Sequence, residues 1–130
     1  KNLYAVLPSG RRIAYPAARI GENRFGHESI LYSGTIQATR KWGTLETYGG
    51  KLAENIVQSV ARDCLRECMM RLDEAGFDIR MHVHDVVIIN VLKDGRSLDE
   101  VIEIMRRPPD WAPDLPLNAA GFTADFYMKD

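Results

Sequence analysis

The spacing of apolar residues predicts one long amphipathic helix in this 130-residue chain, from about Tyr48 to Ala75. Apolar side chains recur there every three or four positions, which is the period of one face of an α-helix. Gly76 follows, and glycine is typical of the position after a helix C-terminus. The apolar face is broad, so we expect the helix to pack against a sheet or other helices along most of its length. Its main row is Leu52, Ile56, Val60, Cys64, Cys68 and Leu72.

The residues before this helix favour strands and loops. Leu3–Leu7 and Arg11–Tyr15 flank the turn residues Pro8-Ser9-Gly10, a pattern that predicts a β-hairpin. Residues 16–28 are rich in turn formers and are expected to form a loop.

A further short strand is expected at residues 29–32. The segment 35–47 has no clear assignment from its pattern. Gly34 and Gly43 interrupt any regular repeat there, since glycine weakens both helices and strands.

Two short β-prone runs follow the helix and enclose a single acidic residue. Phe77–Val83 and Val86–Leu92 are rich in β-branched side chains, and His84-Asp85 separates them. This arrangement predicts a strand–turn–strand with the Asp85 carboxylate at its tip, where it can meet a metal ion. Lys93-Asp94-Gly95 then predicts a turn.

The C-terminal part is expected to hold a second helix and a last strand. Ser97 and Glu100 form a capping box, in which the hydroxyl accepts from a free amide and the carboxylate reaches back. The helix should run to about Arg107, where Pro108-Pro109 ends it. Phe122–Met128 is expected to form the last strand.

Together these elements predict a single α+β domain, 1–130, with an antiparallel sheet packed against the long helix. No run of about 18 apolar residues predicts a membrane span, and no signal peptide is expected. Lys1 in place of an initiator Met suggests a piece of a longer protein. Cys64 and Cys68 point the same way on one helix face, which favours buried thiols in a reducing cytoplasm over a disulfide.

Charge is distributed unevenly, although the net charge is −1. Residues 1–51 carry eight Lys or Arg against three Asp or Glu, whereas the remainder carries nine against fifteen. A basic N-terminal part is compatible with a polyanionic partner such as nucleic acid, and it is equally compatible with chance.

A row of polar side chains follows one flank of the predicted helix. Lys51, Asn55, Gln58 and Arg62 are separated by steps of four, three and four residues, so they line one side. A solvated face usually mixes Lys with Glu, whereas this row is rich in hydrogen-bond donors. The pattern leaves both an ordinary exposed face and a binding face open.

His82, His84 and Asp85 form a second candidate cluster. In a regular strand His82 and His84 would share one face and Asp85 would point to the other. Three such side chains could bind zinc in a small hydrolase, but the run lacks a distant fourth ligand. The zinc hydrolase is therefore kept as one alternative.

At this point the residues carry a resemblance to a known family. ETYGGKLAENIVQSVARDCLRECMMRLDEAGFDIRMHVHDVVIINV, residues 46–91, resembles the C-terminal palm region of family A DNA polymerases of the bacteriophage or prophage type. The shared pattern is a helix with Asn and Gln on its polar side, a strand, a His-Asp turn and a second strand. LPSGRRIAYP before it and PPDWAPDLPL after it also agree, so the resemblance covers essentially the whole chain.

The resemblance implies a role for each candidate residue. Asp85 would be the catalytic aspartate that binds metal, and His84 would lie by the primer 3′ terminus. Asn55 and Gln58 would approach the minor groove of the primer–template DNA, with Lys51 near its backbone. Minor-groove acceptors are common to all four base pairs, so donors there can test pair shape without reading sequence.

The resemblance also implies a reaction and its cofactor. Template-directed transfer of a nucleotide from a dNTP is mainly positioning and charge neutralisation, which two Mg²⁺ ions about 3.5–4 Å apart provide. One aspartate cannot hold both ions. Leu31-Tyr32-Ser33 resembles the start of the family's first metal motif but has Leu31 in place of the aspartate, and the segment before Tyr48-Gly49 resembles the nucleotide-binding fingers helix but has Gln37 in place of the arginine. Both similarities are taken as coincidences. The fingers and the upstream metal motif are therefore expected elsewhere, and the isolated chain is expected to be inactive.

One departure lies within the resemblance itself. The family usually has His-Asp-Glu at the turn, and here Val86 takes the place of the glutamate. A free-standing, non-catalytic remnant that binds primer–template DNA is therefore a second alternative. Self-association through an apolar face left uncovered by the missing parts is also open.

Overall fold

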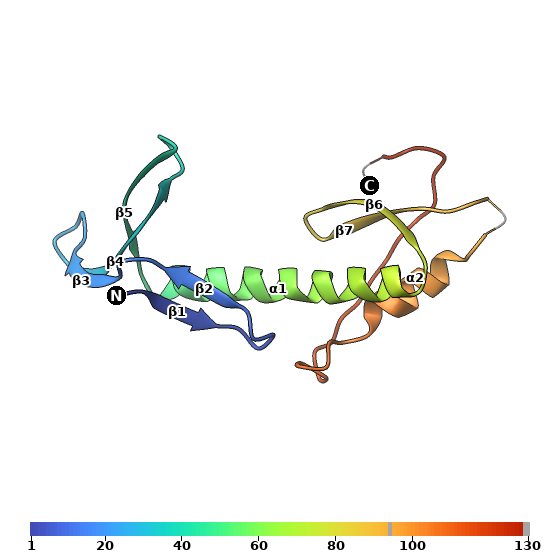
Figure 1. Ribbon diagram of the computed structural model, residues 1–130, viewed down its shortest axis with the longest axis horizontal. Helices are drawn as coiled ribbons and strands as arrows, with labels where there is room; N and C mark the ends of the chain where they lie inside the picture. Colours follow the sequence, from blue (N-terminus) through green and yellow to red (C-terminus); the bar gives the residue numbers. More distant parts are fainter. Residues whose placement is uncertain (94, 129–130) are drawn as a thin grey trace. The chain divides into compact units, whose positions relative to one another are not determined.

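The computed structural model describes residues 1–93 and 95–128 (Figure 1). These residues contain two helices and three separate antiparallel sheets of two, three and two strands. The α+β class expected from the sequence is therefore confirmed, while the palm subdomain and the single-domain organisation stay predictions. The chain divides into two compact units, Lys1–Val60 and Ala61–Asp130, and α1 (Gly49–Glu74) supplies residues to both.

The N-terminal unit begins with the expected hairpin. β1 (Leu3–Val6) pairs with β2 (Arg12–Tyr15) in antiparallel register. Gly10 adopts a φ of +84° in the turn, a conformation that glycine reaches without steric cost. Its amide donates to the carbonyl of Leu7 at 2.8 Å, which closes the turn.

A three-stranded sheet follows, of β3 (Arg19–Glu22), β4 (Glu28–Ile36) and β5 (Lys41–Thr47). The expectation of a continuous loop over 16–28 is wrong, because β3 lies within it. The strand expected at 29–32 is longer than its pattern indicated. Pairing with β4 satisfies the backbone of β3 and β5, and this gain from partners distant in sequence overrides weak local propensity.

Gly34 and Gly43 lie opposite each other in β4 and β5. A Cβ added at Gly34 would lie 2.8 Å from Cδ1 of Leu45, and one at Gly43 would lie 2.8 Å from Cδ1 of Ile36. Both distances are shorter than van der Waals contact, so the missing side chains leave room for Leu45 and Ile36 to lie across the strands. The glycines are thus part of the sheet, and the expectation that they interrupt regular structure is wrong.

Tyr15 is one of the few buried residues of the N-terminal unit. Tyr15, Leu7 and Thr47 are buried, and the rings of Tyr15 and Tyr32 meet edge to face with centroids 5.1 Å apart. Burial, with a smaller contribution from Tyr15, raises the pKa of the Tyr32 hydroxyl above its ordinary value. This contact joins the first hairpin to the three-stranded sheet.

α1 begins and ends within one residue of the expected bounds. Gly76 follows with a φ of +82°, as expected of a residue that ends a helix. Cys64, Cys68 and Leu72 of the apolar row are buried, but Ile56 and Val57 stay exposed. Packing along most of the helix is therefore not observed. Among the described residues, no helix combines the length and the apolar character that a bilayer crossing requires.

The C-terminal unit has a small core around Leu72, Phe77 and Ile104. Its elements are the end of α1, the hairpin β6 (Asp78–Val83) with β7 (Val86–Asn90), and α2 (Leu98–Arg106). Partly buried side chains of the hairpin, of α2 and of the residue just after α1 pack against this core: Ala75, Ile79, Val87, Ile89, Val101 and Met105. The strand–turn–strand expected after the long helix is confirmed.

Two arginines bind the ends of the helices in this unit. Arg71 of α1 donates to the carbonyl of Arg107 at 2.7 Å and to that of Pro108 at 3.0 Å, beyond the end of α2. The guanidinium of Arg96 lies 3.8 Å from the centroid of the Phe77 ring and donates to the carbonyl of Ala75 beyond α1. Both arginines thus satisfy carbonyls that lack partners within a helix.

The start of α2 agrees with the capping box in part. Ser97 Oγ accepts a hydrogen bond from the amide of Glu100 at 3.3 Å, as expected. The Glu100 carboxylate, however, bonds to Arg96. A charged partner within reach offers a stronger hydrogen bond than the neutral amide of Ser97.

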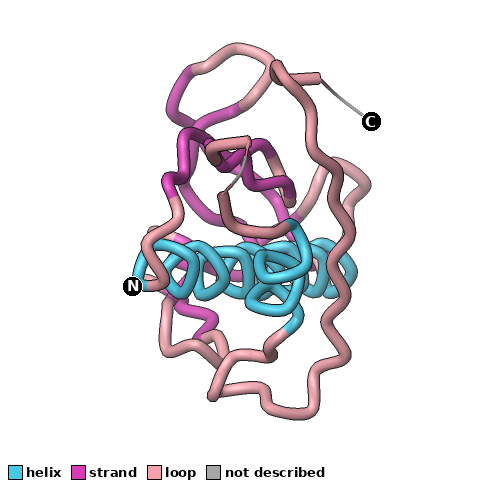
Figure 2. Tube along the Cα trace, turned by 90° about the vertical axis from the view of Figure 1, so that its right-hand side faces the viewer, coloured by secondary structure: helices cyan, strands magenta, loops and turns pink. Residues whose placement is uncertain are grey.

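The residues after α2 form loop (Figure 2). The expected strand over Phe122–Met128 is wrong, since these described residues take no strand conformation. Their large apolar side chains stay exposed, and no neighbouring strand in the described structure provides a ladder for them. Asp94 of the expected turn lies outside the described residues, although Gly95 N–H donates to the Leu92 carbonyl at 2.9 Å.

Candidate functional site

A β-bulge determines the register of the β6–β7 hairpin. Ile79 lies opposite Ile89, but Met81 lies opposite Ile88, so Arg80 is an extra residue on β6. Ile79 and Ile89 face the core of the C-terminal unit. The bulge therefore keeps Ile79 and Ile89 paired in the core, and it shifts the pairing of the residues between the bulge and the loop by one position.

The shift decides which residues form the loop. Continuous pairing from Ile79 would place Val83 opposite Asp85 and leave His84 alone to close the hairpin. A single residue is too short for that, because the tightest common hairpins have two-residue loops. With the bulge, Val83 pairs with Val86, and His84 and Asp85 together form the loop.

His84 adopts a left-handed backbone conformation, which is uncommon for residues other than glycine. Its φ is +54°, in the left-handed region where glycine or asparagine is usual. For other L-residues this conformation costs roughly 1–2 kcal/mol. Its side chain and that of Asp85 are both exposed. Two-residue hairpin loops commonly require a positive φ, and Ala17 and Arg40 adopt similar values elsewhere in the chain, so the conformation follows from the tight turn.

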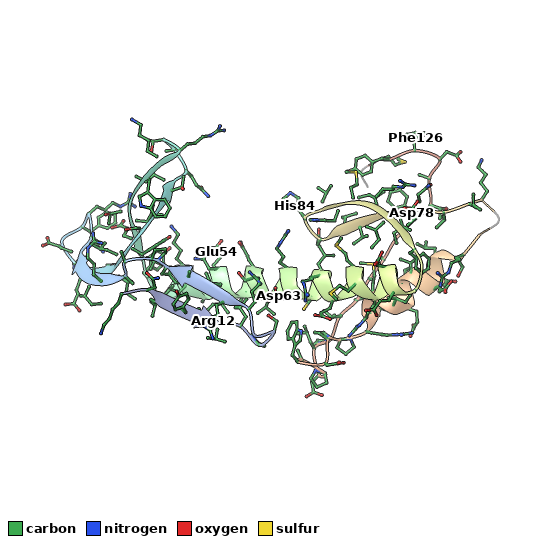
Figure 3. The ribbon with its side chains drawn as sticks, viewed as in Figure 1. Arg12, Glu54, Asp63, Asp78, His84 and Phe126 are labelled. Atoms are coloured by element: carbon green, nitrogen blue, oxygen red, sulfur yellow. The ribbon has the colours of Figure 1, made fainter. Side chains whose placement is uncertain are left out.

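Asp78 lies at the opposite end of the same hairpin from His84 (Figure 3). Its Oδ2 accepts from Arg80 at 2.5 Å and from Asn90 at 3.5 Å. Asp78 is therefore engaged with its neighbours at the open end, and it is not a second acid for the loop.

The structure does not bring the three candidate zinc ligands together. Among the residues that the structure describes, no three His, Cys, Asp or Glu side chains converge to hold a metal ion. The cluster of His82, His84 and Asp85 is therefore not formed, because the loop turns His84 out of the strand geometry. Mg²⁺ keeps several of its waters and uses one or two protein carboxylates, so an exposed Asp85 fits it as one ligand.

The helix residues singled out by the sequence differ in their surroundings. Asn55 is half-buried, and its Nδ2 donates to the Tyr15 hydroxyl at 3.2 Å. Gln58 is exposed, and its Nε2 donates to Oε1 of Glu54 at 3.2 Å on the preceding turn of α1. Lys51 is also exposed. Gln58 and Lys51 can reach a ligand in solvent, whereas the amide group of Asn55 is directed to the first hairpin.

The candidate residues form two groups. Lys51, Asn55 and Gln58 share α1 within the N-terminal unit, while His84 and Asp85 share the hairpin loop of the C-terminal unit. Tyr15 was not anticipated as the partner of Asn55. Its position as the last apolar residue of a hairpin strand was visible in the sequence, but its pairing with a residue 40 positions away was not.

Asp63 was also not anticipated. It is only 4% exposed on α1, and in the helical repeat it lies next to the apolar row. Carboxylates are rarely buried unless they are paired, and hydrophobic periodicity does not predict such a position.

The chain is similar to a protein named DNA polymerase from Bacillus phage SP02, with 50% identity over 129 residues. The similarity covers 98% of this chain and 20% of the phage protein, so the chain spans about one fifth of the length of that curated relative. No protein-family model matches the chain. No solved structure matches it either.

Proposed function

We propose that this chain is part of a DNA polymerase and supplies one aspartate, Asp85, to its catalytic centre. The observation that carries the proposal is the similarity to the phage SP02 polymerase, at 50% identity over nearly the whole chain. The resemblance to the family A palm supports the same reaction and adds the residue roles. The exposed two-residue loop supports the role given to Asp85.

Asp85 would act by holding Mg²⁺ beside the primer terminus. When bound, the metal neutralises charge on the phosphate groups and lowers the barrier to nucleotidyl transfer. The carboxylate is exposed in a loop that the bulge at Arg80 and the Val83–Val86 pair hold in one register. A second acid has to come from another part of the polymerase.

His84 and Gln58 would contact the DNA. Both offer N–H donors on exposed side chains, which suits the acceptors of the minor groove. Lys51 would contribute a positive charge toward the phosphate backbone. Asn55 would act differently, by tying the helix to the hairpin through Tyr15 so that Gln58 is held in place.

The test is a graft in which this chain replaces the matched fifth of the SP02 polymerase. The graft should extend a primer on a template, and Asp85→Asn should lower its rate by about a hundredfold or more, because one charge on the metal site is removed. Asp78→Asn, at the other end of the same hairpin, is the matched control and should retain most of the activity. A folded graft that is inactive with Asp85, or equally active without it, contradicts the proposal.

Val86 separates the enzyme from the non-catalytic DNA-binding alternative. Val86→Glu restores the residue that the resemblance leads us to expect at this position. If the graft gains activity severalfold with the glutamate, the natural valine limits catalysis. Salt-sensitive binding of primer–template DNA by an inactive graft would instead favour the binding remnant.

A further inference from the structure

The sheet of β3, β4 and β5 has two chemically different faces. Residues directly opposite each other in an antiparallel pair project to the same face. One face is apolar and includes Tyr32, which contacts Tyr15. The other face is mainly polar, with Leu31 and Glu46 paired on it away from the β4–β5 turn. Its members toward the β4–β5 turn are Ser33, Thr35, Trp42 and Thr44.

Trp42 is the exception at the turn end of this polar face. Its side chain is 70% exposed, although an indole of this size normally buries most of its surface. No ring stacking or cation–π contact to Trp42 occurs among the described residues. An exposed indole on a hydroxyl-rich strand face is available to stack on a planar group.

The surroundings of Trp42 are basic. Arg40 and Lys41 precede it directly at the turn end of the hairpin, and both are exposed, although Lys41 pairs with Ile36 and so lies on the opposite face of the sheet. No acidic residue occurs between Glu28 and Glu46 in the sequence. The described structure shows no ion pair for either cation. Their charge is therefore available to an anion.

A third cation approaches from β3. Arg19 lies on the polar face, and its Nη2 donates to Thr44 Oγ1 at 3.3 Å across the sheet. Thr44 is two residues from Trp42 on the same strand and the same face. The turn end of β4–β5 projects away from β1 and β2 in Figure 1, so the first hairpin leaves it uncovered.

We propose that this surface, made of Arg19, Arg40 and Trp42, binds single-stranded DNA. The indole would stack on an unpaired base while the two arginines contact neighbouring phosphates, which is a common mode of binding single strands. Duplex DNA fits less well, because its base faces are covered by neighbouring pairs. The choice of DNA among polyanions rests on the proposed function, and the stacking site rests on the geometry alone.

The binding of labelled oligo(dT) to the full 130-residue chain tests this proposal. Trp42→Ala should weaken binding by about tenfold, within the range known for loss of a stacked base. Arg19→Gln combined with Arg40→Gln should reduce the slope of log affinity against log salt by about 1.4, since each phosphate contact on a single strand contributes about 0.7. Trp42→Phe should retain most of the affinity.

Phe25→Ala is the matched control. Phe25 is 67% exposed beside Arg24 at the β3–β4 turn, so it resembles Trp42 in exposure and in its basic neighbour. An equal loss for both alanine variants would overturn the proposal, as would no binding or a preference for blunt duplex DNA. Tighter binding of oligo(rU) would overturn the assignment to DNA.

A fluorescence measurement tests stacking in a chain that keeps Trp42, so its result does not depend on how Trp42→Ala affects folding. In a Trp111→Phe chain Trp42 is the remaining tryptophan, and oligo(dT) should quench its emission through stacking. Unchanged emission at saturating oligonucleotide would contradict stacking. Asp85→Asn should leave oligo(dT) binding unaltered, so an inactive polymerase graft and a failed single-strand site give different results.

Discussion

The side-chain amide of Asn55 donates to the hydroxyl of Tyr15 across 40 residues of sequence, at 3.2 Å. Tyr15 is 3% exposed, so the bond lies at the edge of the small core of the N-terminal unit. Through it α1 is joined to the first hairpin. Gln58, one turn further along α1, bonds only to exposed Glu54 among the described residues. Two amides that look equivalent in the sequence therefore have different surroundings.

We expect Asn55→Ala to lower the free energy of unfolding by about 1 kcal/mol, because the Tyr15 hydroxyl loses a partly buried partner. Gln58→Ala should change it by less than about 0.5 kcal/mol, as is usual for exposed positions. Urea denaturation of the 130-residue chain measures both values. In the graft the order should reverse for primer–template affinity, with Gln58→Ala the weaker binder. Equal effects of the two variants in both assays would contradict these separate roles.

The extra residue in β6 leads to a second prediction. Deleting Arg80 should remove the bulge and let Met81 follow Ile79 opposite Ile88, so the Val83–Val86 pair and the two-residue loop should remain. The graft should therefore keep its activity to within severalfold, because Asp85 stays in the loop. Arg80→Ala keeps the residue count and the bulge and is the control, and backbone amide NMR shifts of the loop should be similar in both variants. A loss of about a hundredfold on deletion alone would show that the loop geometry depends on the bulge itself.

The left-handed conformation of His84 leads to a third prediction. His84→Gly relieves the backbone, so the free energy of unfolding should stay equal or rise by up to about 1 kcal/mol. His84→Val should lower it by about 1 kcal/mol, because a β-branched residue tolerates positive φ poorly. Both variants should lose primer-extension activity in the graft. A glycine variant that is fully active would show that the imidazole has no part in the reaction.

Much of the fold could be predicted where the pattern is local. The helical repeat ending at Gly76, the first hairpin with its turn at Gly10, and the Ser97 cap all follow from residues within one or two turns of each other. The β6–β7 hairpin was also predictable, because its two β-branched runs enclose only His84 and Asp85. The bulge at Arg80 was not, since a register shift depends on the apolar partners chosen across the strands.

The failures share a cause in contacts between distant residues. β3 and β5 exist because β4 pairs with both, and Gly34 becomes favourable in a strand only when Leu45 lies over it. The last expected strand at 122–128 failed for the opposite reason, since its apolar residues found no partner. In the candidate site, Asp85 and His84 are in the loop that the sequence indicated. The engagement of Asn55 with Tyr15 could not be read from α1 alone.

The ion pair between Glu100 and Arg96 leads to the last prediction, which concerns pH. The hydrogen bond from Arg96 is the main reason that the pKa of the Glu100 carboxyl is lowered from its ordinary value. A lowered pKa in the folded chain means that the unfolded chain binds a proton more readily. The stabilisation is therefore fully present above the unfolded-state pKa, and it is lost as pH falls through the folded-state value.

Glu100→Gln removes this titration while keeping the size of the side chain. We expect the urea midpoint of the natural chain to fall more steeply than that of Glu100→Gln as the pH drops from about 6 to about 3, the range that spans an ordinary glutamate. Glu103→Gln, on the exposed side of the same helix, is the matched control and should follow the natural chain. If both variants show the same pH dependence, the Arg96–Glu100 pair has no part in it. Adding 0.5 M salt should reduce the difference in pH dependence between the natural chain and Glu100→Gln. Arg96 and Glu100 lie at the surface, where dissolved ions screen an exposed ion pair.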